Sequence, residues 1–371
     1  MKTQGAILWE RNEAWVVEEL EIDAPKAGEV LVRYVATGLC HSDDHTRTGD
    51  MGPIPLPLLG GHEGAGIVEE VGPGVTSLAP GDHVVATFIP SCGTCRWCST
   101  GHQNLCDLGA VILDGLMVDG TSRLHARGQD VRSQTMVGTF AGHNVVNEHS
   151  LVKIDDDLPL DRACLLGCGV TTGWGAAVNA AAVQPGDTVV VIGCGGIGGS
   201  AIQGARIAGA QNIVAVDTAP QKKDMITTLG ATHFATSMEE AFALVADLTR
   251  GVMADSALLT VGLVHGPMIA QALSLVRKAG TAVLVGVAPW NETTASLPML
   301  EMALFQKTLK GSLFGSSNAR ADIPRLLRLY QSGQLLLDQM VTKTYTLAQV
   351  NDGFDDMLAG NNIRGVIALN Q

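Results

Sequence analysis

Residues 188–217 read TVVVIGCGGIGGSAIQGARIAGAQNIVAVD and predict one strand–turn–helix–strand unit. The run Thr188–Ile192 is apolar and rich in valine, as is typical of a strand buried on both faces. A glycine-rich turn follows it, and an apolar helical stretch runs from about Ile197 to Ala208. Ile213–Val216 is the next buried strand and ends at Asp217. Strands that alternate with helices predict a parallel sheet and an α/β fold.

The glycine turn in this unit has the spacing of a dinucleotide fingerprint, with Gly193, Gly195 and Gly198 in the three glycine positions. A lone match is weak, but this one follows a strand, opens a helix and has Asp217 nineteen residues beyond Gly198. The glycines let the backbone approach a pyrophosphate at the helix N-terminus. Asp217 can accept hydrogen bonds from ribose hydroxyls and would repel a 2′-phosphate, so NAD(H) is favoured over NADP(H). The alternative is a glycine-rich turn without a ligand.

Composition narrows the functional class. The chain has 371 residues, enough for about two domains, and carries a formal net charge of −13. No Lys/Arg run stands out, so neither a nucleic-acid nor an anionic-membrane partner is expected. The first ten residues lack the apolar core of a signal peptide. Eight cysteines without a secretion signal favour metal binding or catalysis over disulfides, and a cytoplasmic location is expected.

The rest of the chain surrounds this unit with other elements. The first third is rich in short β-branched runs bounded by Gly and Pro, namely Val30–Val35, Gly66–Val71 and His83–Thr87. Farther along we expect a buried strand at Val283–Val287, a helix at Ile323–Gln331 and a closing strand at Gly365–Leu369.

Four cysteines stand close together in the first third: Cys92, Cys95, Cys98 and Cys106. Their spacing can bring four thiolates around one point, which is the ligand set of a tetrahedral structural zinc with no open position. Four buried thiols or a disulfide pair are the alternatives, and the density of the cluster argues against both.

A second metal site can be assembled only from distant residues. Cys40, His62 and Cys168 each stand in a short polar or glycine-rich cluster and could form a catalytic zinc site with an open fourth position. Taken one at a time, each is more often a packed thiol or a surface imidazole. Cys164 and Cys194 are expected to be small apolar fillers.

Several motifs together resemble one family. They are Gly38–His45, Gly60–Gly66, the Cys92–Cys106 lobe, Asp119–Arg123, Gly167–Gly173 and Gly193–Gly198. In this order they are similar to the zinc-dependent, medium-chain alcohol dehydrogenases, and the resemblance extends over nearly the whole chain. It implies a GroES-like, β-rich catalytic domain over residues 1–170 and 314–371, with the structural zinc lobe at about residues 91–107. A Rossmann domain with a doubly wound parallel sheet would occupy residues 171–313.

The resemblance also implies roles for individual residues. Cys40, His62 and Cys168 would hold the catalytic zinc, with Glu63 as an alternate ligand and Asp43 orienting His62. Ser42 and His45 would carry the alcohol proton to solvent. The implied cofactor residues are Thr172, Gly193, Gly195, Gly196, Ile197, Gly198, Asp217, Lys222, Val287 and Arg364. Phe88 would form an apolar wall of the substrate pocket.

The chemistry implied is hydride transfer between an alcohol and NAD(H), with two zinc ions per subunit. Zinc lowers the pKa of a bound alcohol, and a dry pocket strengthens that effect. The motifs look most like the actinobacterial enzymes assayed with the nitroso acceptor NDMA, some of which retain NADH as nicotinoproteins. The family forms dimers and tetramers, often through an interface near the segment that corresponds to Leu300–Phe314, so a dimer or a tetramer is expected here.

Three alternatives stay open from the sequence. A thiol-adduct-dependent formaldehyde dehydrogenase of the same family usually has an arginine where this chain has Ala110, and lacks the histidine found here as His45. A polyol enzyme would more often use a carboxylate in place of Cys168. A non-catalytic NAD-binding protein with structural zinc alone would not be expected to keep Cys40, His62 and Cys168 intact.

Overall fold

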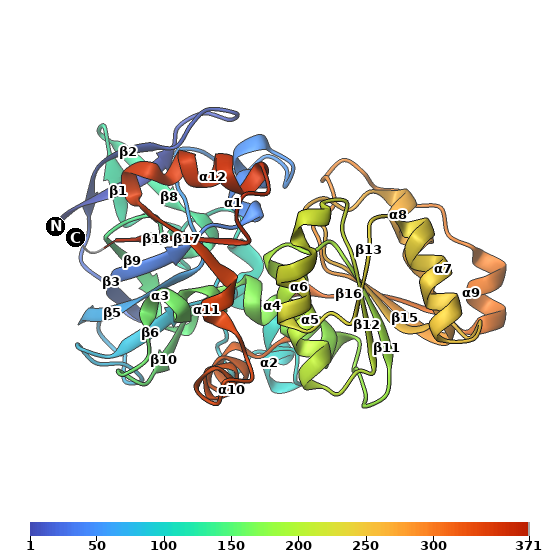
Figure 1. Ribbon diagram of the computed structural model, residues 1–371. Coiled ribbons are helices and arrows are strands. Elements are labelled where there is room, and N and C mark those ends of the chain that lie inside the picture. Colours follow the sequence, from blue (N-terminus) through green and yellow to red (C-terminus); the bar gives the residue numbers. More distant parts are fainter. Residues whose placement is uncertain (370–371) are drawn as a thin grey trace.

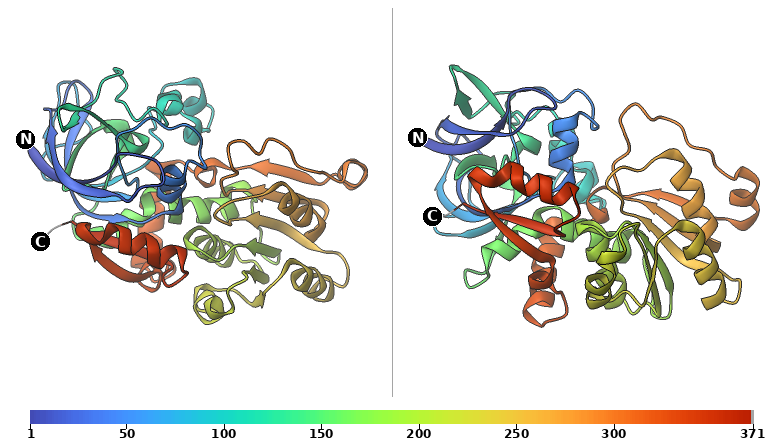
Figure 2. Two further views of the ribbon diagram at one scale, coloured as in Figure 1. Left: turned by 90° about the horizontal axis from the view of Figure 1, so that it is seen from above. Right: turned by 45° about the horizontal axis from the view of Figure 1, so that its top comes forward.

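The computed structural model describes residues 1–369 and shows two lobes side by side (Figure 1). The first lobe holds the N-terminal strands and the last strand of the chain, and the second holds the middle of the sequence. The two further views in Figure 2 show the same division. None of the helices within the described residues combines the length and apolar character that a membrane-spanning helix needs.

The second lobe is built on a six-stranded sheet in the order β13-β12-β11-β14-β15-β16, with every neighbouring pair parallel. The strands are β11 (Thr188–Ile192), β12 (Asn212–Val216), β13 (His233–Ala235), β14 (Ala254–Leu259), β15 (Val276–Leu284) and β16 (Thr308–Gly311). The order reverses between β11 and β14, which is the switch point where doubly wound sheets bind ligands. The predicted parallel sheet is therefore confirmed.

Helices cover both faces of this sheet (Figure 1). On the side toward the first lobe lie α5 (Gly196–Ile207) and α6 (Lys223–Leu229), and on the other side lie α7 (Met238–Leu248), α8 (Gly266–Leu275) and α9 (Met299–Phe305). The predicted helix at 197–208 corresponds to α5 within one residue at each end.

The strand predicted at Val283–Val287 is wrong in its bounds. β15 begins at Val276 and ends at Leu284, where its partner β14 also ends, at Leu259. Beyond this point the backbone N–H groups of Val285 and Gly286 both turn back to the carbonyl of Leu259. Val287 makes only an isolated bridge to Leu263, so it belongs to the loop at the carboxyl end of the sheet.

The first lobe combines a closed barrel with a seven-stranded sheet. The barrel contains β1 (Lys2–Leu8), β2 (Val16–Ile22), β4 (Leu58–Leu59), β7 (Leu124–Ala126) and β8 (Gln129–Ser133). The sheet contains β3 (Glu29–Gly38), β5 (Gly64–Val71), β6 (His83–Ala86), β9 (His143–Asn147), β10 (Leu151–Ile154), β17 (Val341–Thr346) and β18 (Arg364–Ala368). The strands expected in the first third are all present.

The C-terminal segment returns to the first lobe, since β18 pairs with β3. The remaining helices are α1 (His41–Thr48), α2 (Arg96–Ser99), α3 (Leu160–Ala163), α4 (Gly169–Gly175), α10 (Ala319–Gln331), α11 (Leu337–Met340) and α12 (Val350–Leu358). All residues of α4 are buried, and Gly173 lies so close to α5 that an added Cβ would be 2.1 Å from the carbonyl oxygen of Ile197. This contact joins the two lobes along one buried helix.

Candidate active site

Two cavities meet between the lobes. The larger has a volume of about 500 Å³ and follows the glycine turn of the second lobe. The smaller has a volume of about 390 Å³ and extends into the first lobe. Both are lined by the same five side chains, namely Ser42, Met51, Phe88, Cys168 and Leu313. The cavities therefore join at a place that includes three of the predicted site residues, Ser42, Phe88 and Cys168.

Cys40, His62, Glu63 and Cys168 converge at this junction, all four buried, with candidate ligand atoms within 4.8 Å of one another. Cys40 follows β3 directly before α1, and His62 stands just before β5. Because β3 and β5 pair antiparallel, the end of one lies beside the start of the other. Cys168 enters from the residue before α4. The fold thus unites ligands that are far apart in sequence.

The protonation of His62 is fixed by its neighbours. Its Nδ1 lies 2.8 Å from Oδ1 of Asp43, and a carboxylate there accepts the Nδ1 proton. Its Nε2 is buried and has no hydrogen-bond partner among the described residues. Burial alone would lower the pKa of His62, but Asp43 and Cys40 outweigh it and raise that pKa well above its ordinary value. An Nε2 without a hydrogen-bond partner fits a metal ligand, and a metal bound there would replace the proton that this nitrogen otherwise carries.

The two thiols form a coupled pair. A hydrogen bond from Cys168 lowers the pKa of Cys40 well below its ordinary value, and the same bond raises the pKa of Cys168. The pair thus favours one thiolate, with Cys168 still protonated. A zinc ion would displace that proton, since zinc binds thiolates, and two sulfurs with one imidazole nitrogen leave a fourth position open. The donor set fits catalytic zinc.

Glu63 lies beside these ligands and is held in place from two sides. Its Oε1 accepts a hydrogen bond of 2.9 Å from the backbone N–H of Gly169, and its Oε2 forms an ion pair with Arg364. Burial raises the pKa of Glu63 to about 7 in spite of the nearby guanidinium. Its carboxylate belongs to the group of candidate ligand atoms that lie within 4.8 Å of one another, and its role as an alternate metal ligand stays a prediction.

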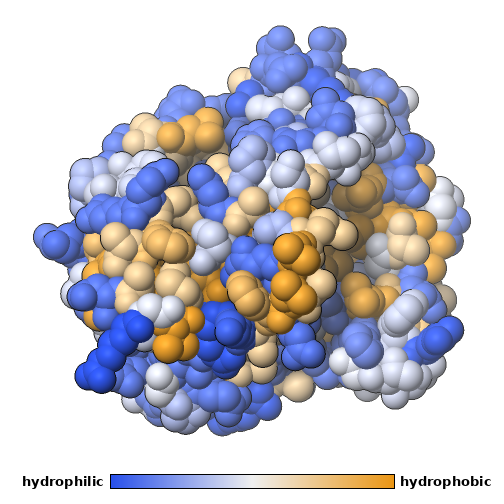
Figure 3. Space-filling view, turned by 90° about the vertical axis from the view of Figure 1, so that its right-hand side faces the viewer, coloured by the Kyte–Doolittle hydropathy of each residue, from blue (hydrophilic) through white to orange (hydrophobic). Residues whose placement is uncertain are grey.

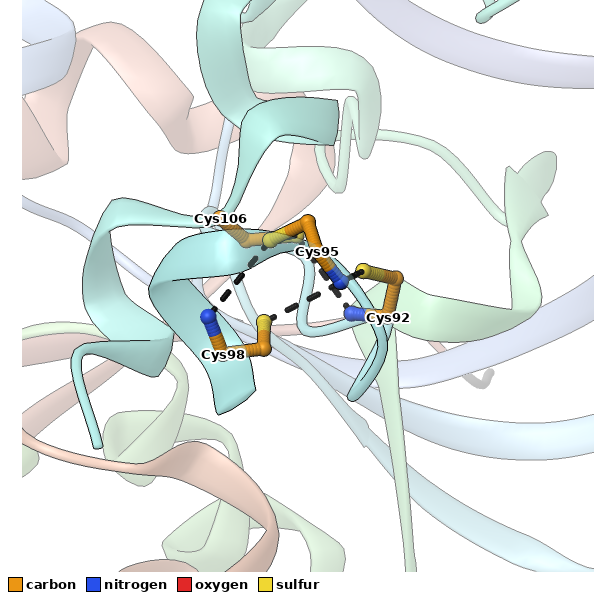
Figure 4. A group of neighbouring side chains, drawn as sticks. All are labelled: Cys92, Cys95, Cys98 and Cys106. Carbon is orange, nitrogen blue, oxygen red and sulfur yellow. Dashed lines mark hydrogen bonds between the residues drawn. The ribbon is translucent and has the colours of Figure 1, made fainter. Parts of the chain in front are cut away.

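The cysteine lobe forms a second, separate cluster (Figure 4). Sγ of Cys92 lies 4.0 Å from Sγ of Cys98, and Sγ of Cys95 lies 4.0 Å from Sγ of Cys106. A disulfide needs about 2.05 Å, so these distances exclude one. A zinc tetrahedron with bonds of about 2.3 Å has edges of about 3.8 Å, close to the spacing observed. Four sulfurs would complete a zinc tetrahedron and would leave no position for a substrate.

The glycine turn forms a cradle for the cofactor at the switch point. Gly193 has φ +94°, and a Cβ on Gly198 would lie 1.9 Å from the carbonyl oxygen of Gly193. An added Cβ on Gly195 would contact nothing within 4 Å, so this residue faces open space. Each of these three glycines therefore has a distinct steric role in the fingerprint.

Asp217 stands at the end of β12, on the rim of the larger cavity. Its Oδ2 accepts hydrogen bonds of 2.8 Å from Cys194 N and Lys222 Nζ, and its Oδ1 accepts one of 2.9 Å from Ala219 N. The remaining predicted cofactor residues that line the same cavity are Thr172, Gly196, Ile197, Val287 and Arg364. Thr172 Oγ1 and Arg364 Nε are buried without a partner, which fits a polar ligand in this cavity.

Comparison with known proteins agrees with this geometry. Residues 26–156 match the alcohol dehydrogenase GroES-like domain family, and residues 196–332 match the zinc-binding dehydrogenase family. The chain is 53% identical to the NDMA-dependent alcohol dehydrogenase of Amycolatopsis methanolica, covering 99% of each chain. The chain belongs to the zinc-dependent medium-chain alcohol dehydrogenases.

Solved structures of this family superpose closely on the chain. An alcohol dehydrogenase zinc-binding domain protein from Burkholderia ambifaria has a TM-score of 0.94 at 35% identity, and the benzyl alcohol dehydrogenase of Acinetobacter calcoaceticus has 0.93 at 32%. Both comparisons cover 100% of both chains. The predicted combination of a GroES-like part and a Rossmann part is confirmed.

The predicted relay residues of this medium-chain dehydrogenase, Ser42 and His45, both line the larger cavity. The hydroxyl of Ser42 lies 3.8 Å from Sγ of Cys40, at the junction of the cavities. The ring of His45 is buried and is bonded to Oδ2 of Asp50 and to the carbonyl oxygen of Gly262, each at 3.2 Å. The side chain of Asp50 is 31% exposed, and the step that would carry a proton from His45 to water stays a prediction.

Sequence reasoning missed three residues of the site. His41 lines the larger cavity beside His45, and burial lowers the pKa of its imidazole. Met51 and Leu313 line both cavities. His41 adjoins the ligand Cys40 and could have been suspected for that reason. Met51 and Leu313 carry no chemical signal in the sequence.

Proposed function

We propose that this chain is a zinc-dependent alcohol dehydrogenase that interconverts alcohols and aldehydes or ketones by hydride transfer with NAD(H). One observation carries the proposal: the unpartnered Nε2 of His62 and the thiols of Cys40 and Cys168 converge where the glycine-lined cavity meets an apolar one. A metal and a dinucleotide placed there would lie side by side. Zinc would supply Lewis-acid polarisation of an alcohol oxygen, and a nicotinamide would supply the hydride acceptor.

The chain's own residues would then move the proton and exclude water. Ser42 is placed to accept the alcohol proton, since its hydroxyl borders both cavities near Cys40. His45, bonded to Asp50, provides the onward path toward the surface. Phe88 packs edge-on against His62 with ring centroids 6.0 Å apart and keeps this wall apolar. A dry wall strengthens every charge interaction at the junction.

The experiment that tests the function measures zinc per chain and alcohol oxidation in one preparation. Two zinc ions per chain together with alcohol-dependent hydride transfer support the proposal. One ion would then belong to the site of Cys40, His62 and Cys168, and the other to the cysteine lobe. One zinc and no turnover would support the alternative, an NAD-binding protein with structural metal alone.

We propose further that the enzyme retains NAD(H) and reoxidises it in place. The support is the 53% identity to an NDMA-dependent alcohol dehydrogenase and a cofactor cavity that lies between two lobes. Asp217, with Lys222 bonded to it, favours NAD(H) over NADP(H). Rapid desalting of purified protein followed by a spectrum at the reduced-nicotinamide band tests retention. Protein that loses its nicotinamide and turns over only with added NAD would contradict it.

The substrate class we propose is small apolar alcohols, including aromatic ones. None of the described residues that line the smaller cavity is Lys, Arg, Asp or Glu. Ala110 lies in this lining, so an anionic thiol adduct would find no Lys or Arg side chain there to pair with. The structural similarity to a benzyl alcohol dehydrogenase favours the same class. A panel of aliphatic, benzylic and anionic alcohols tests it, and preference for an anionic adduct would overturn it.

We also propose a homo-oligomer, either a dimer or a tetramer. β16 is an edge strand of the six-stranded sheet, and apolar side chains beside it on α9 are largely exposed: Met299 by 72%, Leu300 by 74% and Leu304 by 69%. Figure 3 views this end of the molecule and shows apolar side chains gathered there. An open edge next to an apolar patch favours pairing with a second copy. Light scattering on the eluted protein tests this, and a monomer at micromolar concentration would contradict it.

Two other predictions accompany the function. The domain division at residues 170 and 314 is supported by the separate sheets that the two parts form. A cytoplasmic location stays a prediction from the sequence.

A further inference from the structure

One side chain of the cysteine lobe (Cys92–Cys106) forms a hydrogen bond to a residue outside this segment. Asn104 stands between the third and fourth cysteines, is 8% exposed, and donates a hydrogen bond of 3.0 Å from Nδ2 to the carbonyl oxygen of Leu313. The two residues are 209 positions apart in sequence. A buried side-chain amide that satisfies one distant backbone carbonyl fixes the two segments relative to each other.

The segment that receives this bond has an unusual backbone. Leu313–Ser316 forms a short turn in which Phe314 has φ +54° and Ser316 also has φ +54°, both in the left-handed region. Non-glycine residues rarely adopt this conformation, and they keep it only where surrounding contacts hold them. Gly315 lies against α4, since an added Cβ there would be 2.4 Å from the carbonyl oxygen of Thr172. The turn is thus held by α4 on one side and by Asn104 of the lobe on another.

The turn forms part of the active-site wall. Leu313 lines both cavities. Phe314 is 2% exposed and packs edge-on against Phe88, with ring centroids 5.1 Å apart, and Phe88 packs in turn against His62. A shift of the turn would therefore move Leu313, which lines both cavities. It would also move Phe314 and with it the packing of Phe88 against His62.

We propose that Asn104 is a positioning residue, through which the ordered cysteine lobe sets the width of the substrate pocket at Leu313. The inference rests on the proposed function. The lobe then has a second role besides cross-linking its own loop. When the cysteine lobe is ordered, Asn104 holds Leu313 in place, and Leu313 borders the part of the substrate beyond the reacting carbon. Substrates large enough to reach Leu313 depend on this bond, and the smallest alcohols do not.

The variant Asn104→Asp tests this, because it keeps the shape of the side chain but places an oxygen against the Leu313 carbonyl. The zinc-loaded enzyme is assayed with benzyl alcohol and with ethanol, well below its melting temperature. We expect KM for benzyl alcohol to rise about tenfold, which corresponds to about 1.4 kcal/mol, the order of one lost hydrogen bond. KM for ethanol should change by less than about twofold, and kcat should change little for either alcohol.

The matched control is Asn351→Asp. Asn351 Nδ2 donates to the carbonyl oxygen of Trp15 at 2.9 Å, so the control loses the same kind of bond away from both cavities. It should lower stability without changing the ratio of the two KM values. If Asn104→Asp behaves like this control, Asn104 has only a structural role and the inference is wrong.

A neutral variant separates the effect of the added charge from the effect of the lost hydrogen bond. Asn104→Ser removes the bond without adding a carboxylate, and it gives the deciding measurement if Asn104→Asp does not fold. An unchanged KM ratio in Asn104→Ser would likewise reject the inference. A wild-type enzyme that oxidises neither alcohol would instead contradict the proposed function itself, and the inference with it.

Discussion

The two sulfur clusters of this chain differ in how the sequence builds them. The lobe takes four cysteines from one segment of fifteen residues, Cys92–Cys106, and two of them are partly exposed. The junction cluster takes Cys40, His62 and Cys168 from three segments, and all are buried. A local cluster can be recognised from spacing alone. A dispersed one exists only once β3, β5 and α4 have come together.

The clusters also differ in what they leave open. The four sulfurs of the cysteine lobe would complete a zinc tetrahedron, so a metal bound there would have no position for a reactant. The junction has three strong donors, and Asp43 holds the imidazole in the tautomer that a metal requires. A reactive zinc site therefore requires three protein ligands instead of four, so that one coordination position is left for the substrate.

The largest effect should come from Cys40→Ala. Removing one of three ligands should abolish metal binding at the junction and lower turnover by at least about a thousandfold, because zinc contributes several kcal/mol of transition-state stabilisation. Zinc analysis should then find the lobe ion alone. Cys164→Ala is the matched control, since Cys164 is also fully buried but lies outside the cluster. Retained turnover in Cys40→Ala would reject the proposed site.

A smaller effect is expected from Asp43→Asn. The amide can no longer stabilise the Nδ1–H of His62 as a carboxylate does, so zinc affinity at the junction should fall about 10- to 100-fold. Competition with a chelator, followed by zinc analysis, measures this for each site separately. The neighbouring Asp44, which pairs with Arg47 instead, provides the control variant Asp44→Asn. Equal zinc loss from both clusters would show that Asp43 does not act through His62.

Sequence reasoning succeeded where one short segment contains the whole signal. β11, the glycine turn and Asp217 were all predicted, because a buried run, a GxGxxG turn and a carboxylate follow one another within thirty residues. It failed at the end of β15, whose last pair is set by where β14 stops and not by the apolar residues Val285 and Val287.

The same limit applies inside the active site. The contact of His45 with Gly262 joins residues 217 positions apart, and the bond from Asn104 joins residues 209 apart. Neither spacing nor periodicity in the sequence predicts such pairs, since each depends on how distant segments of the chain pack against each other. The resemblance to a family placed Ser42 and His45 in one relay, whereas the contacts of the His45 ring with Asp50 and Gly262 could be seen only in the folded chain.

The smallest effect on the chemistry should come from Cys95→Ala, although the protein as a whole would lose stability. The lobe would bind zinc weakly with three sulfurs, and the melting temperature should fall by several degrees because metal binding there is coupled to folding. Turnover of ethanol per folded chain should stay within about threefold of wild type, since the junction ligands are untouched. Ser99→Ala, an exposed change on α2, the short helix that Cys95 caps, is the control and should alter neither quantity. If Cys95→Ala abolished ethanol turnover in a fully folded, normally assembled protein, the two clusters could no longer be assigned separate roles.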